Sequence, residues 1–339
     1  MTTPSRCRIR SASLLGTILL ALPALAAEPA PAGDAAATAP PGAAATAGGH
    51  GRELNGHVFM PADDVRGALV TTSFTSGLLV GLGSAHADFQ VGDRTLSGDF
   101  EYAGVGAVLG YEYAPLDYLS VRLAVSELIY SGTTGRSAIV VGTSLQGGAG
   151  AGVTLSLPIG DSLRVGALFD ATYGPNFALT VGQALKTVID SCSEPSGCDV
   201  DSGSAFTAKN VFELKPGVAA NWAPLPSLGF TANATYVRAD QTINGHEFNG
   251  NAMELGAAAD FDFAAISPVP IGLQVQFSWL APNGSALQHV TDLGGGIFYT
   301  GRKELALGIQ IIARRFAVTP DVDVSWSTFV SNIGMRYYW

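Results

Sequence analysis

Apolar and polar residues alternate with a period of two through most of this chain. Between Met253 and Phe263, the odd positions carry Met, Leu, Ala, Ala, Phe and Phe, and the even positions carry Glu, Gly, Ala, Asp and Asp. The same division recurs in 145–157, 163–173 and 271–279. Successive side chains of a β-strand point to opposite faces, so this pattern predicts strands with one apolar and one polar face.

Twelve segments show this pattern or a closely related one. They are 79–89, 100–113, 119–130, 144–157, 163–173, 210–222, 228–238, 252–263, 271–280, 291–300, 304–312 and 323–339. Every second link between them is short and often holds proline, whereas most of the others are longer and more polar, the longest being 174–210. An even strand number with alternating short and long links is typical of bacterial outer-membrane barrels, in which short turns face the periplasm. We therefore predict an all-β fold, a transmembrane antiparallel up-and-down β-barrel of about 12 strands over 77–339.

The segments before the barrel have other compositions. Residues 1–26 combine a positive start (Arg6, Arg8 and Arg10), an apolar stretch and an Ala-Leu-Ala site, which together predict a cleaved signal peptide. Residues 27–57 are rich in Ala, Pro and Gly and nearly free of large apolar residues, so we expect a disordered periplasmic leader. Residues 58–76 either precede the barrel or enter it as a plug.

Composition narrows the class of function. Charged residues make up only 14% of the chain, yet no apolar stretch is long enough for a spanning helix. Basic residues are outnumbered by acidic ones, 18 to 28, and they form no stripe with interleaved aromatics. Nucleic acid is therefore not an expected partner, whereas outer-membrane lipid is.

The chain ends on its most specific motif. Asn332, Gly334, Tyr337 and Trp339 fit a pattern of a polar residue, a glycine, an aromatic or apolar residue and a terminal aromatic. This end resembles the C-terminal β-signal of bacterial outer-membrane proteins. The resemblance implies that the barrel-assembly machinery is a partner. The alternation of short and long links predicts that both termini are periplasmic. The motif covers eight residues and identifies a class, not an activity.

The polar strand faces supply the candidate functional residues. They either line a pore and set its selectivity or form internal ion pairs that fill the barrel. These lumen-lining candidates are Arg122, Arg164, Asp170, Glu213, Lys215, Glu254, Asp260, Asp262 and Arg336.

Other chemistry receives little support. Cys192 and Cys198, in the longest loop, are expected to form a disulfide in an oxidising compartment. No metal site or cofactor motif is expected. A barrel phospholipase is a minor alternative, because Ser285 near His289 lacks a recognisable nucleophile motif. The leading expectation is a pore or transporter for small solutes, and the alternative is a closed structural or surface-interaction barrel that acts through its external loops.

Overall fold

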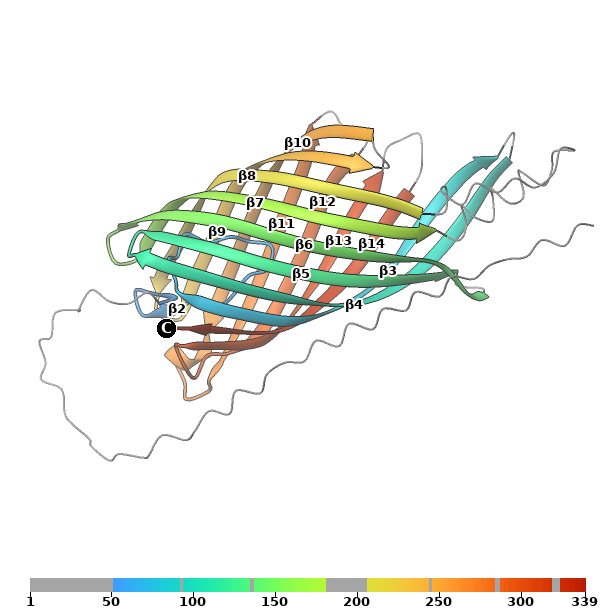
Figure 1. Ribbon diagram of the computed structural model, residues 1–339. Coiled ribbons are helices and arrows are strands. Elements are labelled where there is room, and N and C mark those ends of the chain that lie inside the picture. Colours follow the sequence, from blue (N-terminus) through green and yellow to red (C-terminus); the bar gives the residue numbers. More distant parts are fainter. Residues whose placement is uncertain are drawn as a thin grey trace, which may run out of the picture. The chain divides into compact units, whose positions relative to one another are not determined.

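The computed structural model describes residues 51–91, 94–134, 137–180, 206–243, 246–283, 287–318 and 324–339. Within these ranges, twelve antiparallel strands close into one barrel, and each strand pairs with its sequence neighbours (Figure 1). The barrel strands are β3 (Ser73–Val91), β4 (Arg94–Leu116), β5 (Leu119–Thr134), β6 (Ser137–Ile159), β7 (Leu163–Thr180), β8 (Phe206–Leu225), β9 (Leu228–Ile243), β10 (His246–Asp262), β11 (Ile271–Asn283), β12 (Leu287–Tyr299), β13 (Leu305–Val318) and β14 (Val324–Tyr338).

Each of the twelve expected segments corresponds to one of these strands, so the predicted fold class is confirmed. β14 closes the barrel by pairing with β3 from Tyr338↔Ser73 to Val324↔Ala87. Among the described residues, no helix has the length and apolar character that a membrane span requires.

The alternation in the sequence becomes the two faces of the wall. In β11, Leu273, Val275 and Phe277 are 42%, 60% and 43% exposed on the outside. Gln274 and Gln276, which lie between them, are 2% and 3% exposed on the inside. A closed sheet that is mainly apolar outside and polar inside is the architecture of an outer-membrane barrel, because lipid then meets mainly apolar side chains and the backbone groups of the wall pair between strands.

The strands are longer than expected at the end opposite the short turns. β6 begins at Ser137 and β7 continues to Thr180, with pairs out to Gly142↔Thr180. Both ends of the expected 174–210 loop, 174–180 and 206–210, are therefore strand, since β8 already begins at Phe206. Backbone pairing needs no apolar face, so strands that continue beyond the lipid lose the period-two signal without losing their hydrogen bonds. Residues 181–205, with both expected disulfide cysteines, lie outside the described residues.

The expected end of the leader at His57 was wrong. β1 (Glu53–Leu54) and β2 (His57–Val58) already form a small hairpin, and the Asn55–Gly56 turn between them adopts positive φ angles. The leader's composition hid this hairpin because, within the described residues 51–57, two of the three buried side chains are the polar Arg52 and His57. The ordered chain before the barrel therefore includes 52–57.

Candidate functional site

Residues 52–72, called the lumen segment below, contact the inner wall of the barrel along their whole length. The segment begins at the end with the short turns. Arg52 is 2% exposed and donates hydrogen bonds to the carbonyl oxygens of Lys303 (3.0 Å), Leu305 (2.7 Å) and Phe59 (3.1 Å). Its guanidinium also lies 5.1 Å from the centre of the Tyr338 ring. A buried guanidinium with this many acceptors fixes the start of the segment to the β12–β13 turn.

Glycines in the wall provide the space into which the segment packs. A Cβ atom at Gly229 would overlap the His57 ring, and one at Gly272 would overlap the Met60 side chain. The Met60 backbone N–H lies 3.4 Å from Asp260, and the His57 ring packs edge-on against Phe59 at 4.7 Å. The side chains of the segment thus occupy space that would be filled if a residue larger than glycine stood at these two wall positions.

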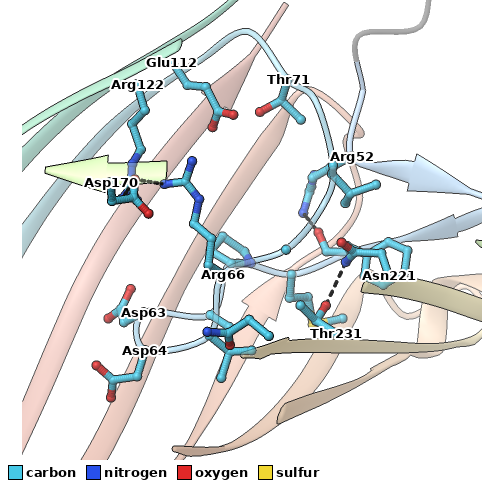
Figure 2. Close-up of a pocket in the computed structure, with 18 of the residues that line it drawn as sticks. Arg52, Asp63, Asp64, Arg66, Thr71, Glu112, Arg122, Asp170, Asn221 and Thr231 are labelled. Atoms are coloured by element: carbon cyan, nitrogen blue, oxygen red, sulfur yellow. Dashed lines mark hydrogen bonds and ion pairs between the residues drawn. The ribbon is translucent and has the colours of Figure 1, made fainter. Parts of the chain in front are cut away.

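The middle of the segment, Pro61–Gly67, is held by polar contacts and is called the tip below. Asn332 donates to Asp63 (2.7 Å), and Arg314 lies 3.6 Å from Asp64. Arg66 binds Asp170 (3.2 Å) and donates to Thr154 (2.8 Å). Figure 2 shows Asp63 and Asp64 on one side of the tip and Arg66 pointing toward Asp170. The tip is therefore bound to three separate parts of the wall, each through charged or amide groups.

The segment then returns to the short-turn end, where β3 begins. The Ala68 N–H donates to Asn221 (2.5 Å), which in turn donates to Thr231 (2.8 Å; Figure 2). Ala68 is fully buried and packs against Leu168 and Ala219. The return limb is thus anchored by apolar packing and by a buried amide.

Most of the candidate charges on the polar strand faces form ion pairs inside the barrel. Arg122 binds Asp170 (3.1 Å), so this carboxylate is shared with Arg66 of the tip. Lys215 lies between Glu213 (3.1 Å) and Glu254 (3.6 Å). Two further candidates stand near the short-turn end: Arg336 binds Glu112 (2.6 Å), and Arg164 lies 3.4 Å from the Asp117 carbonyl oxygen.

Asp260 and Asp262 face inward but do not line open space. They are 1% and 4% exposed, Asp260 beneath Met60 and Asp262 accepting from Thr300 (2.8 Å). Asp262 also caps the short turn Phe263–Ala265 by accepting from the Ala264 N–H (3.0 Å). These two carboxylates support the lumen segment and the turn below it.

A cavity of about 310 Å³ remains between the lumen segment and the wall. It is bounded on one side by the tip and on the other by the side chains of Glu112, Arg122, Asp170, Lys215, Glu254 and Arg336. Its lining is rich in charge of both signs. Among the described residues, no cluster of histidine, cysteine and carboxylate side chains could hold a metal ion.

Burial raises the pKa of both carboxyl groups of the tip, Asp63 and Asp64. The pKa of Asp64 is raised to about 6 because burial disfavours the carboxylate, and Arg314 opposes this shift only in part. The nearby acids Asp292, Asp63 and Glu254 also raise this pKa.

Sequence reasoning missed several inward-facing charges. Glu112 lies between the outward-facing Tyr111 and Tyr113, so the alternation already placed it inside. The same reasoning applies to Asp292 and Arg314, which form a two-pronged ion pair at 2.7 and 2.8 Å. Arg52, Asp63, Asp64 and Arg66 carried no periodic signal, because their segment is not a barrel strand.

The C-terminal motif residues lie on both faces of β14. Asn332 and Gly334 face inward, where Asn332 contacts the tip, whereas Tyr337 and Trp339 are exposed on the outer surface. The Trp339 ring lies 5.9 Å from Tyr111 and 5.8 Å from Tyr337. Such an aromatic cluster is typical of a membrane interface.

No family model matches the chain, and no curated protein matches it. Solved structures with a similar arrangement include the translocator domain of the autotransporter NalP from Neisseria meningitidis, at 10% identity and a TM-score of 0.44, covering 78% of this chain and 88% of that one. The transport unit of the autotransporter AIDA-I from Escherichia coli has 10% identity and a TM-score of 0.45, with 78% and 90% covered. The Pseudomonas putida toluene transporter TodX has 9% identity and a TM-score of 0.40, with 79% and 89% covered. At these values the similarities carry no argument about activity.

Proposed function

We propose that this chain is a channel for small solutes in the bacterial outer membrane, closed at its short-turn end by the lumen segment. The observation that carries the proposal is the way in which the tip is held. Asp63, Asp64 and Arg66 bind the wall through polar and ionic contacts, beside a charged cavity, and Val65 is the buried apolar side chain between them. Water can replace such contacts when the tip moves, whereas it cannot replace the apolar packing of the return limb.

Beyond the tip, the inner wall is open to solvent. Ser126 and Gln146 face the lumen and are exposed, in contrast to the buried inward-facing residues nearer the short turns, such as Ser120 and Thr154. The barrel thus combines an open half with an obstructed half. By the usual orientation of such barrels, the obstructed half and both termini face the periplasm.

One group of charges on the inner wall favours cations. Glu213 and Glu254 flank the single Lys215, so this part of the wall carries net negative charge. Carboxylates at a constriction raise the local concentration of cations. A small cation or a small neutral polar solute therefore fits the lumen better than an anion.

Planar-bilayer recordings test the proposal. The wild-type protein should be mostly closed. Arg66→Ala removes two contacts of the tip but leaves Asp170 paired with Arg122, so it should raise the open probability about tenfold or more. Lys303→Ala is the matched control, because it removes an exposed ion pair with Glu53 at the start of the segment.

Deletion of residues 52–72 should give a permanently open pore that prefers cations, and Glu213→Gln with Glu254→Gln should weaken that preference. Silence of all variants, with folding shown by heat-modifiable gel mobility, would overturn the channel. The closed structural barrel would then be the better account. The phospholipase alternative receives no support from the geometry, because Ser285 lies outside the described residues.

A further inference from the structure

A group of charges with a net positive sign lies on one side of the cavity beside the tip. Arg66 and Arg122 bind the same oxygen of Asp170, at 3.2 and 3.1 Å. A Cβ atom at Gly152 would overlap this oxygen, so the glycine lets Arg122 reach Asp170 across the strand that lies between them. Two guanidinium groups thus share one carboxylate, which leaves net positive charge that a second carboxylate can balance.

A group with the opposite net charge lies next to the first. Lys215 is the ladder partner of Asp170, and its ammonium group lies between Glu213 (3.1 Å) and Glu254 (3.6 Å). Two carboxylates share one ammonium group here, which leaves net negative charge that a second ammonium group can balance. The inner wall at the cavity is therefore positive at β5–β7 and negative at β8–β10.

Other charged side chains at the cavity do not change this division. Arg336 and Glu112 form an ion pair at 2.6 Å and neutralise each other. Asp63 and Asp64 lie on the opposite side of the tip from the Arg66 side chain (Figure 2).

Two buried polar groups of β9 lie beside the negative group. Thr235 is the ladder partner of Glu254, and Asn233 is two residues away on the same inward face. Both line the cavity and are 5% and 8% exposed, and within the part of the chain that the structure describes neither the Thr235 hydroxyl nor the Asn233 Oδ1 oxygen has a hydrogen-bond partner. Buried oxygens of this kind are unfavourable until a donor reaches them. Together with the Glu254 carboxylate, they match the donors of a primary ammonium group.

The tip stands against these acceptors in the closed state. A Cβ atom at Gly256 would overlap the Asn233 oxygen and would lie 3.2 Å from the Val65 side chain. Val65 is 4% exposed, and its apolar side chain supplies no donor to the oxygen beside it. An ammonium group that takes the place of Val65 would supply one. Binding of such a solute and docking of Val65 therefore compete.

We infer that the cavity is a binding site for a zwitterionic solute, with an ammonium group at one end and a carboxylate at the other. The ammonium group binds at Glu254, Asn233 and Thr235. The carboxylate binds at the guanidinium groups of Arg66 and Arg122. The inference rests on the proposed channel function and names the class of its small polar solute, which carries no net charge.

The spacing of the two sites sets the length of the solute. β7 and β10 are three strand spacings apart, which is about 14 Å along the wall, and the inward-pointing side chains shorten the gap. The two charges of the solute must therefore be several bonds apart, as in an ω-amino acid or a dipeptide. The cavity volume of about 310 Å³ corresponds to roughly ten water molecules and suits a solute of this size.

Isothermal titration calorimetry on the full chain in lipid nanodiscs tests the site, with 6-aminohexanoate as the probe. We expect saturable binding. Hexanoate and hexylamine each carry only one of the two charges and should bind at least tenfold more weakly. The N-trimethyl derivative of the probe keeps both charges but has no N–H to donate to Asn233 and Thr235, so it should bind at least tenfold more weakly as well. Glycine, whose charges are too close together, should also bind weakly.

Paired variants locate the two ends of the solute. Arg122→Gln should weaken the binding of 6-aminohexanoate about tenfold, whereas Arg164→Gln should not, because Arg164 does not line the cavity. Glu254→Gln should also weaken binding about tenfold. Its control is Glu127→Gln, because Glu127 is exposed and lies away from the cavity.

A gain of affinity provides a test that misfolding cannot imitate. Val65→Ala removes the side chain that competes with the solute and should raise the affinity for 6-aminohexanoate at least threefold. Val70→Ala is the matched control, because Val70 is a buried valine of the same lumen segment that does not line the cavity. It should leave the affinity unchanged.

The outcomes distinguish the site from the channel. Binding of hexylamine or of hexanoate as tight as that of 6-aminohexanoate would show a site for a single charge and would overturn the inference. Absence of binding to both the wild-type protein and Val65→Ala would overturn it as well. Calorimetry does not depend on conductance, so silent bilayer recordings together with intact zwitterion binding would contradict the channel and leave the site.

Discussion

At the scale of single residues, Asp64 makes the tip sensitive to pH. The pKa of its carboxyl is raised from 3.8 to about 6 by burial, so the docked tip favours the protonated form. The contribution of Asp64 to docking is therefore fully present below the ordinary pKa and is lost as the pH rises through about 6. The charged groups around Asp64 act in both directions. Arg314 lowers its pKa, whereas the pKa is raised further by Asp292, Asp63 and Glu254.

We predict that raising the pH from 5 to 7 increases the ratio of open to closed channels about tenfold, since nearly half of the total effect of the shift lies in this interval. Asp64→Asn keeps the shape of the side chain and cannot ionise, so its open probability should change little over the same range. Single-channel recordings at both pH values measure the effect. An unchanged pH response in Asp64→Asn would show that another group is responsible.

The two faces of a strand give a second residue-scale prediction. Leu255 is 42% exposed toward lipid, so Leu255→Arg should reduce the free energy of unfolding by roughly 2–4 kcal/mol. Ser126 is exposed toward the lumen, and Ser126→Arg should cost far less because water surrounds the new charge. Reversible folding into lipid vesicles measures both values. Equal costs would mean that the face assigned to one of the two positions is wrong.

At the scale of elements, the lumen segment depends on the absence of side chains in the wall. Gly272→Leu would occupy the place of Met60 and should displace the segment while the outer face of the barrel stays unchanged. Gly250→Leu is the control, because a Cβ atom there would meet nothing within 4 Å. We expect a raised open probability for Gly272→Leu alone, with both variants retaining heat-modifiable mobility on gels. A closed Gly272→Leu channel would show that the segment is held mainly by its other contacts.

The elements also show why the sequence predicted the barrel better than the site. A strand with lipid on one side must repeat its apolar residues every second position, so the twelve strands were visible in the sequence. The lumen segment is irregular, and its buried residues Arg52, His57 and Met60 follow no period. Its decisive partners are also distant, as Arg66 and Asp170 are separated by 104 residues. Only the closed fold brings such residues together.

At the scale of the whole molecule, the barrel closes where its last strand, β14, meets its first strand, β3. The Trp339 N–H donates to the Thr72 carbonyl oxygen (3.1 Å), and Tyr338 pairs with Ser73. The last residue thus meets the end of the lumen segment and the first residue of the first barrel strand. The motif that resembles an assembly signal lies at the end of β14. We therefore propose that recognition by the barrel-assembly machinery and closure of the barrel use the same residues.

We predict that deletion of Trp339 sharply reduces the yield of protein in the outer membrane. The deletion removes the terminal aromatic residue and its ring contacts with Tyr111 and Tyr337. It also removes a hydrogen bond at the place where β14 meets the start of β3. Deletion of Ala36, in the Ala- and Pro-rich stretch, is the control and should leave the yield unchanged. Trp339→Phe is a second control, since it keeps both an aromatic end and the backbone hydrogen bond. Outer-membrane yield on heat-modifiable gels should be near wild type for Trp339→Phe and low for the deletion. Equal yields in the Trp339 and Ala36 deletions would show that neither assembly nor closure depends on the terminal residue.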